Sequence, residues 1–158
     1  MEICLKSTVS FEELKNIMFD IGFKVQEDFQ MNDIYMINKD VDISLDNKDV
    51  IFKDNILVRE TVGKKILLVN KIKELDDNGI VIGERSIKCP ITDSESGYKF
   101  LCSIGYKKAF ELRDHNLLVT NGDSIDGLVN TIKKYNLPLD YSNISVKKSL
   151  EMLKIICK

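Results

Sequence analysis

Short apolar segments separated by turn residues occupy the middle of the chain, and this pattern constrains the fold most. Strands are expected at residues 2–6, 24–29, 33–37, 56–61, 66–71, 80–89 and 117–120. The run Asp76-Asp77-Asn78-Gly79 is the strongest hairpin signal between two of them. Because short strands joined by tight turns pair with their neighbours, the pattern predicts an antiparallel sheet.

Two helices with matching signals precede two of these strands. Ser10 and Glu13 form a capping-box pattern before a helix that Gly22 should end. Thr92 or Asp93 can cap a second helix, 94–104, before Gly105. Both helices lead into Ile-Gly-aromatic-Lys and a strand, which indicates a weak internal duplication. Further helices are expected through 132–135 and at 146–156.

Length and charge limit the class of protein. The 158 residues carry 23 Lys and Arg against 25 Asp and Glu, so we expect no DNA partner bound through a broad positive field. There is no Pro/Gly/Ser-rich linker, which favours one domain over 1–158. No apolar run is long enough for a membrane span, and the N-terminus has no signal-peptide core. A cytoplasmic protein is therefore expected.

The four cysteines, Cys4, Cys89, Cys102 and Cys157, form no Cys-x-x-Cys pair, and there is one histidine. A Cys/His zinc site is therefore not expected, and small buried thiols are the plainer interpretation. The histidine, His115, has no nucleophile motif beside it.

Charged residues recur two positions apart along the expected strands, as in Lys71 with Lys73 and Glu111 with Arg113. Residues at this spacing share a face of a strand. They could form the polar outer face of the sheet. Alternatively, a closed sheet could turn them inward, where buried cations would need an anion such as phosphate. Inward carboxylates would pair with the bases or hold Mg²⁺.

An ordered series of short motifs resembles the CYTH superfamily, named for class IV adenylate cyclase and thiamine triphosphatase and also called triphosphate tunnel metalloenzymes. The series runs from residue 2 to about residue 113. Its members are Glu2-Ile-Cys4-Leu-Lys6, Asp33-Ile-Tyr35, Ile56-Leu57-Val58-Arg59, Leu68-Val-Asn-Lys71, Glu84-Arg-Ser86 and Ile104-Gly105-Tyr106.

The resemblance implies an α+β fold, in which an antiparallel β-barrel forms a tunnel with helices packed outside. It implies Lys6, Arg59, Lys71 and Arg113 as ligands of the substrate phosphates, with Lys6 and Lys71 catalytic. Glu2 and Glu84 would hold Mg²⁺ or Mn²⁺. Lys73 is a further candidate phosphate ligand or a solvated lysine, and Asp33 with Tyr35 is expected to be structural.

The family's activities make the expected substrate a small molecule with a triphosphate, such as tripolyphosphate, thiamine triphosphate or ATP. The enzyme would be a triphosphatase (a hydrolase) or an adenylate cyclase-like phosphorus-oxygen lyase. The sequence leaves open whether the protein forms a homodimer. Cys4, Leu57 and Ser86 stand where the family carries Glu, Arg and Glu. The alternative is therefore a catalytically degenerate domain of this fold that binds an anionic ligand or a protein partner.

Overall fold

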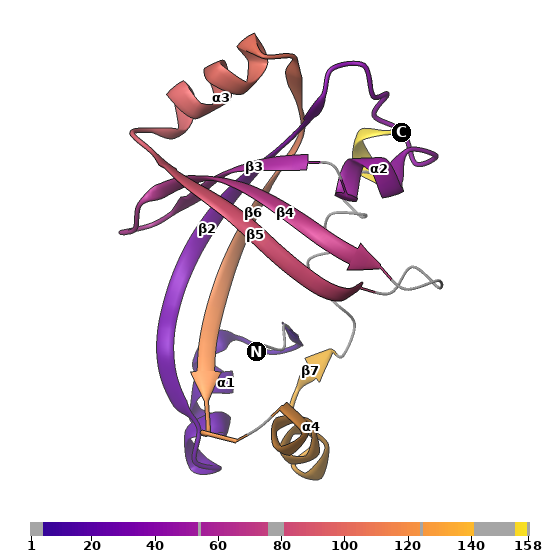
Figure 1. Ribbon diagram of the computed structural model, residues 1–158. Coiled ribbons are helices and arrows are strands. Elements are labelled where there is room, and N and C mark those ends of the chain that lie inside the picture. Colours follow the sequence, from indigo (N-terminus) through magenta and orange to yellow (C-terminus); the bar gives the residue numbers. More distant parts are fainter. Residues whose placement is uncertain (1–4, 54, 76–80, 124, 141–153, 158) are drawn as a thin grey trace. The chain divides into compact units, whose positions relative to one another are not determined.

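The computed structural model describes residues 5–53, 55–75, 81–123, 125–140 and 154–157 (Figure 1). Helices and strands alternate along the chain in a mixed α+β order. The helices are α1 (Phe11–Asp20), α2 (Lys48–Lys53), α3 (Ser94–Ser103) and α4 (Ile125–Lys134). The strands are β1 (Lys6–Ser7), β2 (Lys24–Asn38), β3 (Asn55–Thr61), β4 (Ile66–Leu75), β5 (Val81–Ile91), β6 (Tyr106–Thr120) and β7 (Leu139–Asp140).

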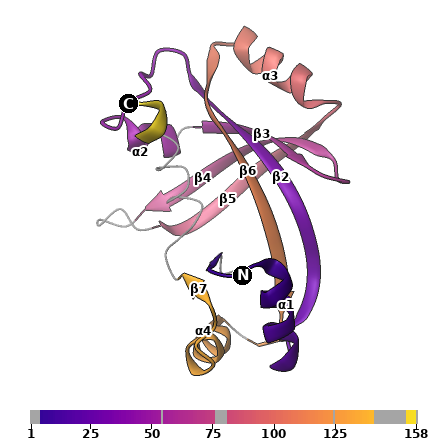
Figure 2. The ribbon, with the colours of Figure 1, turned by 180° about the vertical axis from the view of Figure 1, so that it is seen from behind.

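Five of these strands form one sheet in the order β5-β4-β3-β2-β6. The neighbours from β2 to β5 pair antiparallel, as the turn pattern predicts. The long hairpin of β4 and β5 is seen from both sides in Figures 1 and 2. A second, two-stranded sheet pairs β1 with β7 antiparallel.

The chain forms two compact units. The first unit holds the described residues within 1–29 and 115–148, and the second holds those within 30–114 and 149–158. Strands β2 and β6 run through both units. Among the described residues, the first unit holds one buried hydrophobic cluster and the second unit holds two.

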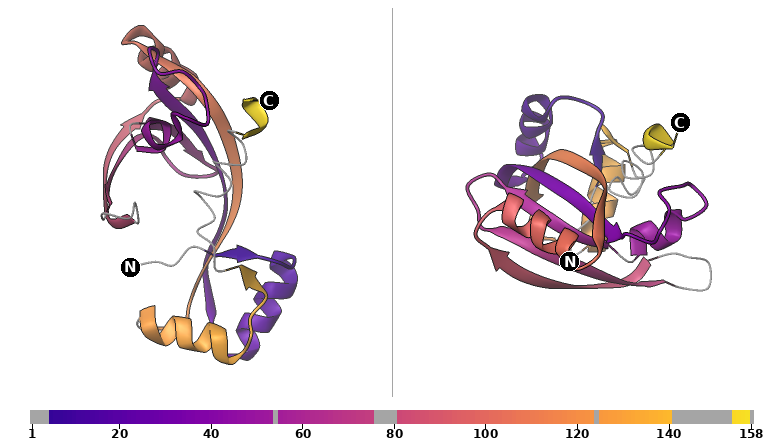
Figure 3. Two further views of the ribbon diagram at one scale, coloured as in Figure 1. Left: turned by 90° about the vertical axis from the view of Figure 1, so that its right-hand side faces the viewer. Right: turned by 90° about the horizontal axis from the view of Figure 1, so that it is seen from above.

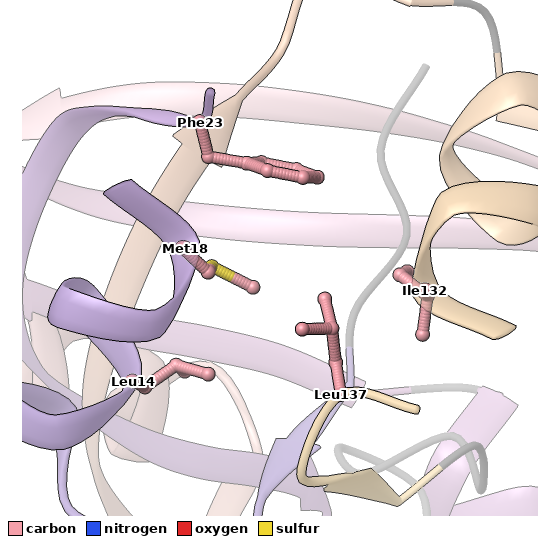
Figure 4. Packing of buried hydrophobic residues seen from close by; sticks show 5 residues of the cluster. All are labelled: Leu14, Met18, Phe23, Ile132 and Leu137. Carbon is pink, nitrogen blue, oxygen red and sulfur yellow. The ribbon is translucent and has the colours of Figure 1, made fainter. Parts of the chain in front are cut away.

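In the first unit, α1 and α4 contribute to one core. Leu14 and Met18 of α1 face Phe23, Ile132 of α4 and Leu137 (Figure 4). All five side chains are at most 5% exposed. Burying side chains of this size stabilises a fold by about 1.5–3 kcal/mol each.

In the second unit, the two faces of the curved sheet carry different helices (Figure 3). Leu101 of α3 packs with Met36 and Val58 on one face, which we call the α3 face. Ile51 of α2 packs with Ile37 and Phe110 on the other, which we call the α2 face. The candidate site residues must therefore be assigned to one of these two faces.

The expected helix boundaries are confirmed. Ser10 Oγ accepts a hydrogen bond from the amide of Glu13, and Asp93 Oδ1 accepts one from that of Ser96. Gly22 and Gly105 follow the two helices with φ of 88° and 96°. This left-handed conformation suits glycine. Each ten-residue helix then leads into a fifteen-residue strand, β2 or β6.

The predicted barrel needs correction. Within the described residues the larger sheet is open, with five strands and no recorded pairing between its edges β5 and β6. The prediction separated strands at 24–29 and 33–37, where the polar Gln30 and Asn32 interrupt the apolar pattern, and it gave a short strand at 117–120. No Gly or Pro stands at 30–32 or 114–116, so the backbone continues and forms single strands, β2 and β6.

Other expectations differ in detail. The sequence did not predict α2. The hairpin turn predicted at 76–79 and most of the helix expected at 146–156 lie outside the described residues. Cys89, Cys102 and Cys157 are exposed free thiols, so the expectation of buried thiols is wrong for them. In the part of the chain that the structure describes, no helix is long and apolar enough to cross a membrane.

Candidate functional site

Strand register brings two of the predicted phosphate ligands, Arg59 and Lys71, to the same face. Arg59 is opposite Asp33 on one side and Leu67 on the other. Residues directly opposite in a sheet share a face, and so do residues two apart along a strand. Leu67 and Lys71 are four residues apart in β4. Arg59 and Lys71 therefore both lie on the α2 face.

Asp33 holds Arg59 in place on that face. Arg59 Nε donates to Asp33 Oδ1 at 2.7 Å, and Arg59 Nη2 donates to Asp33 Oδ2 at 2.5 Å. The side chains are 20% and 4% exposed. A bidentate pair with this burial fixes the plane of the guanidinium group. The expected structural role of Asp33 fits this contact.

The surroundings of Lys71 come from the hairpin of β4 and β5. Lys71 is opposite Ser86, and the next residue of β5 on the same face, the exposed Lys88, is opposite Val69. Lys73 is opposite Glu84 in the register. The side chains of Lys73 and Glu84 lie outside the described part of the structure.

Arg113 has a different position from Arg59 and Lys71. Its Nη2 donates to Glu111 Oε1 at 3.2 Å, and its side chain is 82% exposed. Glu111 also has a hydrogen bond with Asn32, which is opposite Glu60 in the register. Asn32 and Glu60 belong to the α3 face. Residues 111 and 113 share a face, so Arg113 projects from the α3 face and away from Arg59.

The charges around Glu111 set its protonation. Burial favours the neutral carboxyl, but hydrogen bonds from Arg113 and Asn32 outweigh it. With the nearby Lys108 they lower the pKa of Glu111. Arg113 thus has a carboxylate partner on its own strand.

The remaining predicted residues are at the N-terminus. Lys6 is exposed in β1, opposite Asp140 in the register, and it belongs to the first unit. Glu2 lies outside the described residues. Of the four predicted phosphate ligands, the structure brings Arg59 and Lys71 to one face of one unit.

The first unit holds a charged cluster that the sequence did not predict. Asp28 of β2 binds Lys15 of α1, and its Oδ1 lies 2.5 Å from His115 Nε2 of β6. The ring of Phe11 lies 4.7 Å from that of His115. The bonds from Lys15 and His115 lower the pKa of Asp28. Asp28 and His115 are 87 positions apart, so only strand pairing could have predicted this contact.

The described residues do not form a metal site of the expected kind. Among them, no group of three or more His, Cys, Asp and Glu side chains is arranged to hold an ion. On the α2 face, Asp33 is already bound by Arg59 through both oxygens. A hard divalent ion needs several oxygen ligands, so the described donor set does not fit one.

Three solved structures share the fold along nearly the whole chain. The PH1012 protein of Pyrococcus horikoshii has 14% identity and a TM-score of 0.57, with 96% of this chain and 99% of that one covered. The PH1819 protein of the same organism has 13% identity and a TM-score of 0.57, with 93% and 97% covered. A "putative adenylate cyclase" of Vibrio parahaemolyticus has 14% identity and a TM-score of 0.53, with 91% and 95% covered.

No family model and no curated protein matches the chain. The comparisons therefore establish a shared fold, and the chemistry must be argued from the residues.

Proposed function

We propose that the α2 face of the second unit binds the triphosphate group of a small molecule. The observation that carries the proposal is the pair of cationic side chains, Arg59 and Lys71, on one face of the sheet. The Vibrio parahaemolyticus structure supports it, because its name gives an activity on a nucleoside triphosphate. The motif series that resembles the CYTH superfamily, which selected these two residues, also favours a phosphate ligand.

Physical chemistry favours this face as an anion site. Asp33 orients the guanidinium of Arg59 before any ligand arrives, so little conformational entropy is lost on binding. Asp33 also neutralises that charge. Further positive charge on this face, such as that of the exposed Lys88, therefore adds to the attraction for phosphate.

We further propose that the bound triphosphate is hydrolysed or cyclised with Mg²⁺ or Mn²⁺ held by Glu2 and Glu84, as the family resemblance implies. Such an ion would supply charge stabilisation in the transition state. In this proposal the edges of the larger sheet approach one another to form a tunnel around the ligand.

A thermal shift measurement tests the binding step. Tripolyphosphate should raise the melting temperature of the wild type, because a ligand that binds the folded state stabilises it. Lys71→Gln should remove most of this shift. The control is Lys99→Gln on α3, where Lys99 pairs only with Glu95 at the surface. An equal loss in both variants would show general electrostatics and contradict a site at Lys71.

A variant of Arg113 tests whether this residue binds phosphate, as the motif series implies, or lies away from the ligand, as its position in the structure indicates. Since Arg113 projects from the α3 face and pairs with Glu111, Arg113→Gln should retain the shift caused by tripolyphosphate. If Arg113→Gln removes the shift as fully as Lys71→Gln does, the ligand does not lie on the α2 face as proposed.

The alternative is a domain that binds the anion without chemistry. It is favoured by the absence of a three-ligand acidic group among the described residues. Phosphate and pyrophosphate release from tripolyphosphate, thiamine triphosphate and ATP, with Mg²⁺ or Mn²⁺, separates the two. A stabilised protein that turns over none of them supports the alternative, and release that Glu84→Gln abolishes supports the enzyme.

A further inference from the structure

A cavity of about 460 Å³ lies at the end of β2 in the second unit, next to α2 and the start of β6. Figure 1 shows these elements near one end of the sheet. The cavity is lined by Ile37, Asn38, Asp40, Val41, Val50 and Tyr106. Its volume is within the range of small-molecule sites. None of these residues is among the predicted phosphate or metal ligands.

One part of the lining is apolar. Ile37, Val41 and Val50 line the cavity together with Tyr106. Val50 is 43% exposed, so an apolar side chain of the wall is in contact with water. Covering such a side chain with an apolar ligand group is favourable, at about 25 cal/mol per Å² of apolar surface.

The other part of the lining is polar and negatively charged. Asn38 Oδ1 accepts a hydrogen bond from the backbone amide of Asp40 at 2.9 Å, which fixes the turn that carries this carboxylate. Among the described residues, no Lys, Arg or His nitrogen lies within 4.0 Å of the Asp40 carboxylate. A carboxylate beside an apolar wall suits an organic cation, because the charged group can pair with the carboxylate while the body covers the apolar side chains.

We propose that this cavity binds a small organic cation, in which an ammonium or amidinium group is joined to an apolar or aromatic body. The charged group would pair with Asp40, and the body would lie against Val50 and Tyr106. The site is separate from the anion site, because Ile37 and Asp33 are four residues apart on β2, about 13 Å. It does not depend on the proposed triphosphate binding.

Benzylamine and benzyl alcohol are matched probes for this site, since they differ mainly in charge. Each is titrated into the ¹⁵N-labelled full-length chain, and amide shifts are followed by NMR. Benzylamine should give saturable shifts centred on Asn38, Asp40 and Val41. It should bind up to about 5-fold more tightly than the alcohol, the most that an exposed ion pair allows. Absence of saturable shifts with benzylamine, or equal affinity for both probes, overturns the proposal.

Two variants then locate the charge preference. Asp40→Asn should make the two affinities equal. Asp42→Asn, a matched change at an exposed aspartate outside the lining, should leave the 5-fold preference. If both variants abolish the preference, the cation responds to the general negative field and the assignment to Asp40 is wrong. Tripolyphosphate binding is measured in the same samples, so failure of either site is seen separately.

Discussion

The pair formed by Asp33 and Arg59 is the most constrained ionic contact on the α2 face. Both hydrogen bonds are short, and the carboxylate is 4% exposed. Removing one partner of a buried pair leaves the other charge without compensation. The pair therefore contributes to stability as well as to the orientation of Arg59.

We expect Asp33→Asn to lower the free energy of unfolding by roughly 2–4 kcal/mol, the lower part of this range reflecting the partial exposure of Arg59. Urea denaturation measures the change. Lys99→Gln, which breaks an exposed pair on α3, should cost less than about 0.5 kcal/mol. Equal effects of the two variants would show that burial of Asp33 does not matter.

The pH dependence of the Asp28 cluster follows from the lowered pKa of Asp28. A carboxyl with a lowered folded-state pKa stabilises the protein above its unfolded pKa, which is about 3.9. This contribution is lost as the pH falls through the folded-state value. The stability difference between wild type and Asp28→Asn should therefore shrink as the pH falls below about 4.

Urea denaturation between pH 6 and pH 3 measures this difference. The matched control is Asp20→Asn, which removes an exposed aspartate outside this cluster. A difference for Asp28→Asn that stays constant down to pH 3 would show that Lys15 and His115 do not stabilise the ionised carboxyl.

At the residue scale, the sequence indicated which side chains are candidates for the site, but it did not indicate which side chains they contact. It selected Arg59 and Lys71, which share a face. It could not predict that Asp33 would bind Arg59 26 positions away, because that contact depends on strand register. The same limit applies to Arg113. Its bond to Glu111, which also contacts Asn32, places it on the α3 face.

At the scale of elements, the two helix–strand halves repeat one construction. A capped helix of ten residues ends before a glycine at positive φ, and a strand of fifteen residues follows. Caps and glycines are local signals, so the sequence predicted these boundaries. The six-residue α2 docks through Ile51 against Ile37 and Phe110. This is a tertiary contact, which no local sequence pattern predicts.

The glycine after α3 gives a test of this construction. Gly105→Ala should destabilise the protein by about 1 kcal/mol, because the left-handed conformation costs an alanine more than the entropy it removes from the unfolded chain. A Cβ atom there would meet no atom within 4 Å, so the effect isolates backbone strain. Gly105→Asn should retain most of the stability, since asparagine tolerates this conformation. Equal losses for alanine and asparagine, measured by urea denaturation, would contradict the explanation.

At the scale of the whole molecule, the sequence predicted one domain, and the structure has two compact units with separate cores. The two units exist without a linker sequence between them because they share strands. Strands β2 and β6 pass from one unit to the other without interruption. A composition-based boundary signal cannot be found inside a continuous strand.

Because both units share β2 and β6, we expect them to unfold together. Leu14→Ala, a change in the core of the first unit, should cost about 3 kcal/mol. It should reduce protection from hydrogen exchange on the order of 100-fold for slowly exchanging amides of both units, such as those of Met18 and Val58. Asn16→Ala, at an exposed position of the same helix, controls for changes in α1 itself and should leave the protection of both amides nearly unchanged.

Loss of protection confined to Met18 would mean that each unit folds separately, and the prediction of a single domain would be wrong. Loss at both would show that the shared strands couple the two cores, and that a ligand bound on the α2 face stabilises the first unit as well.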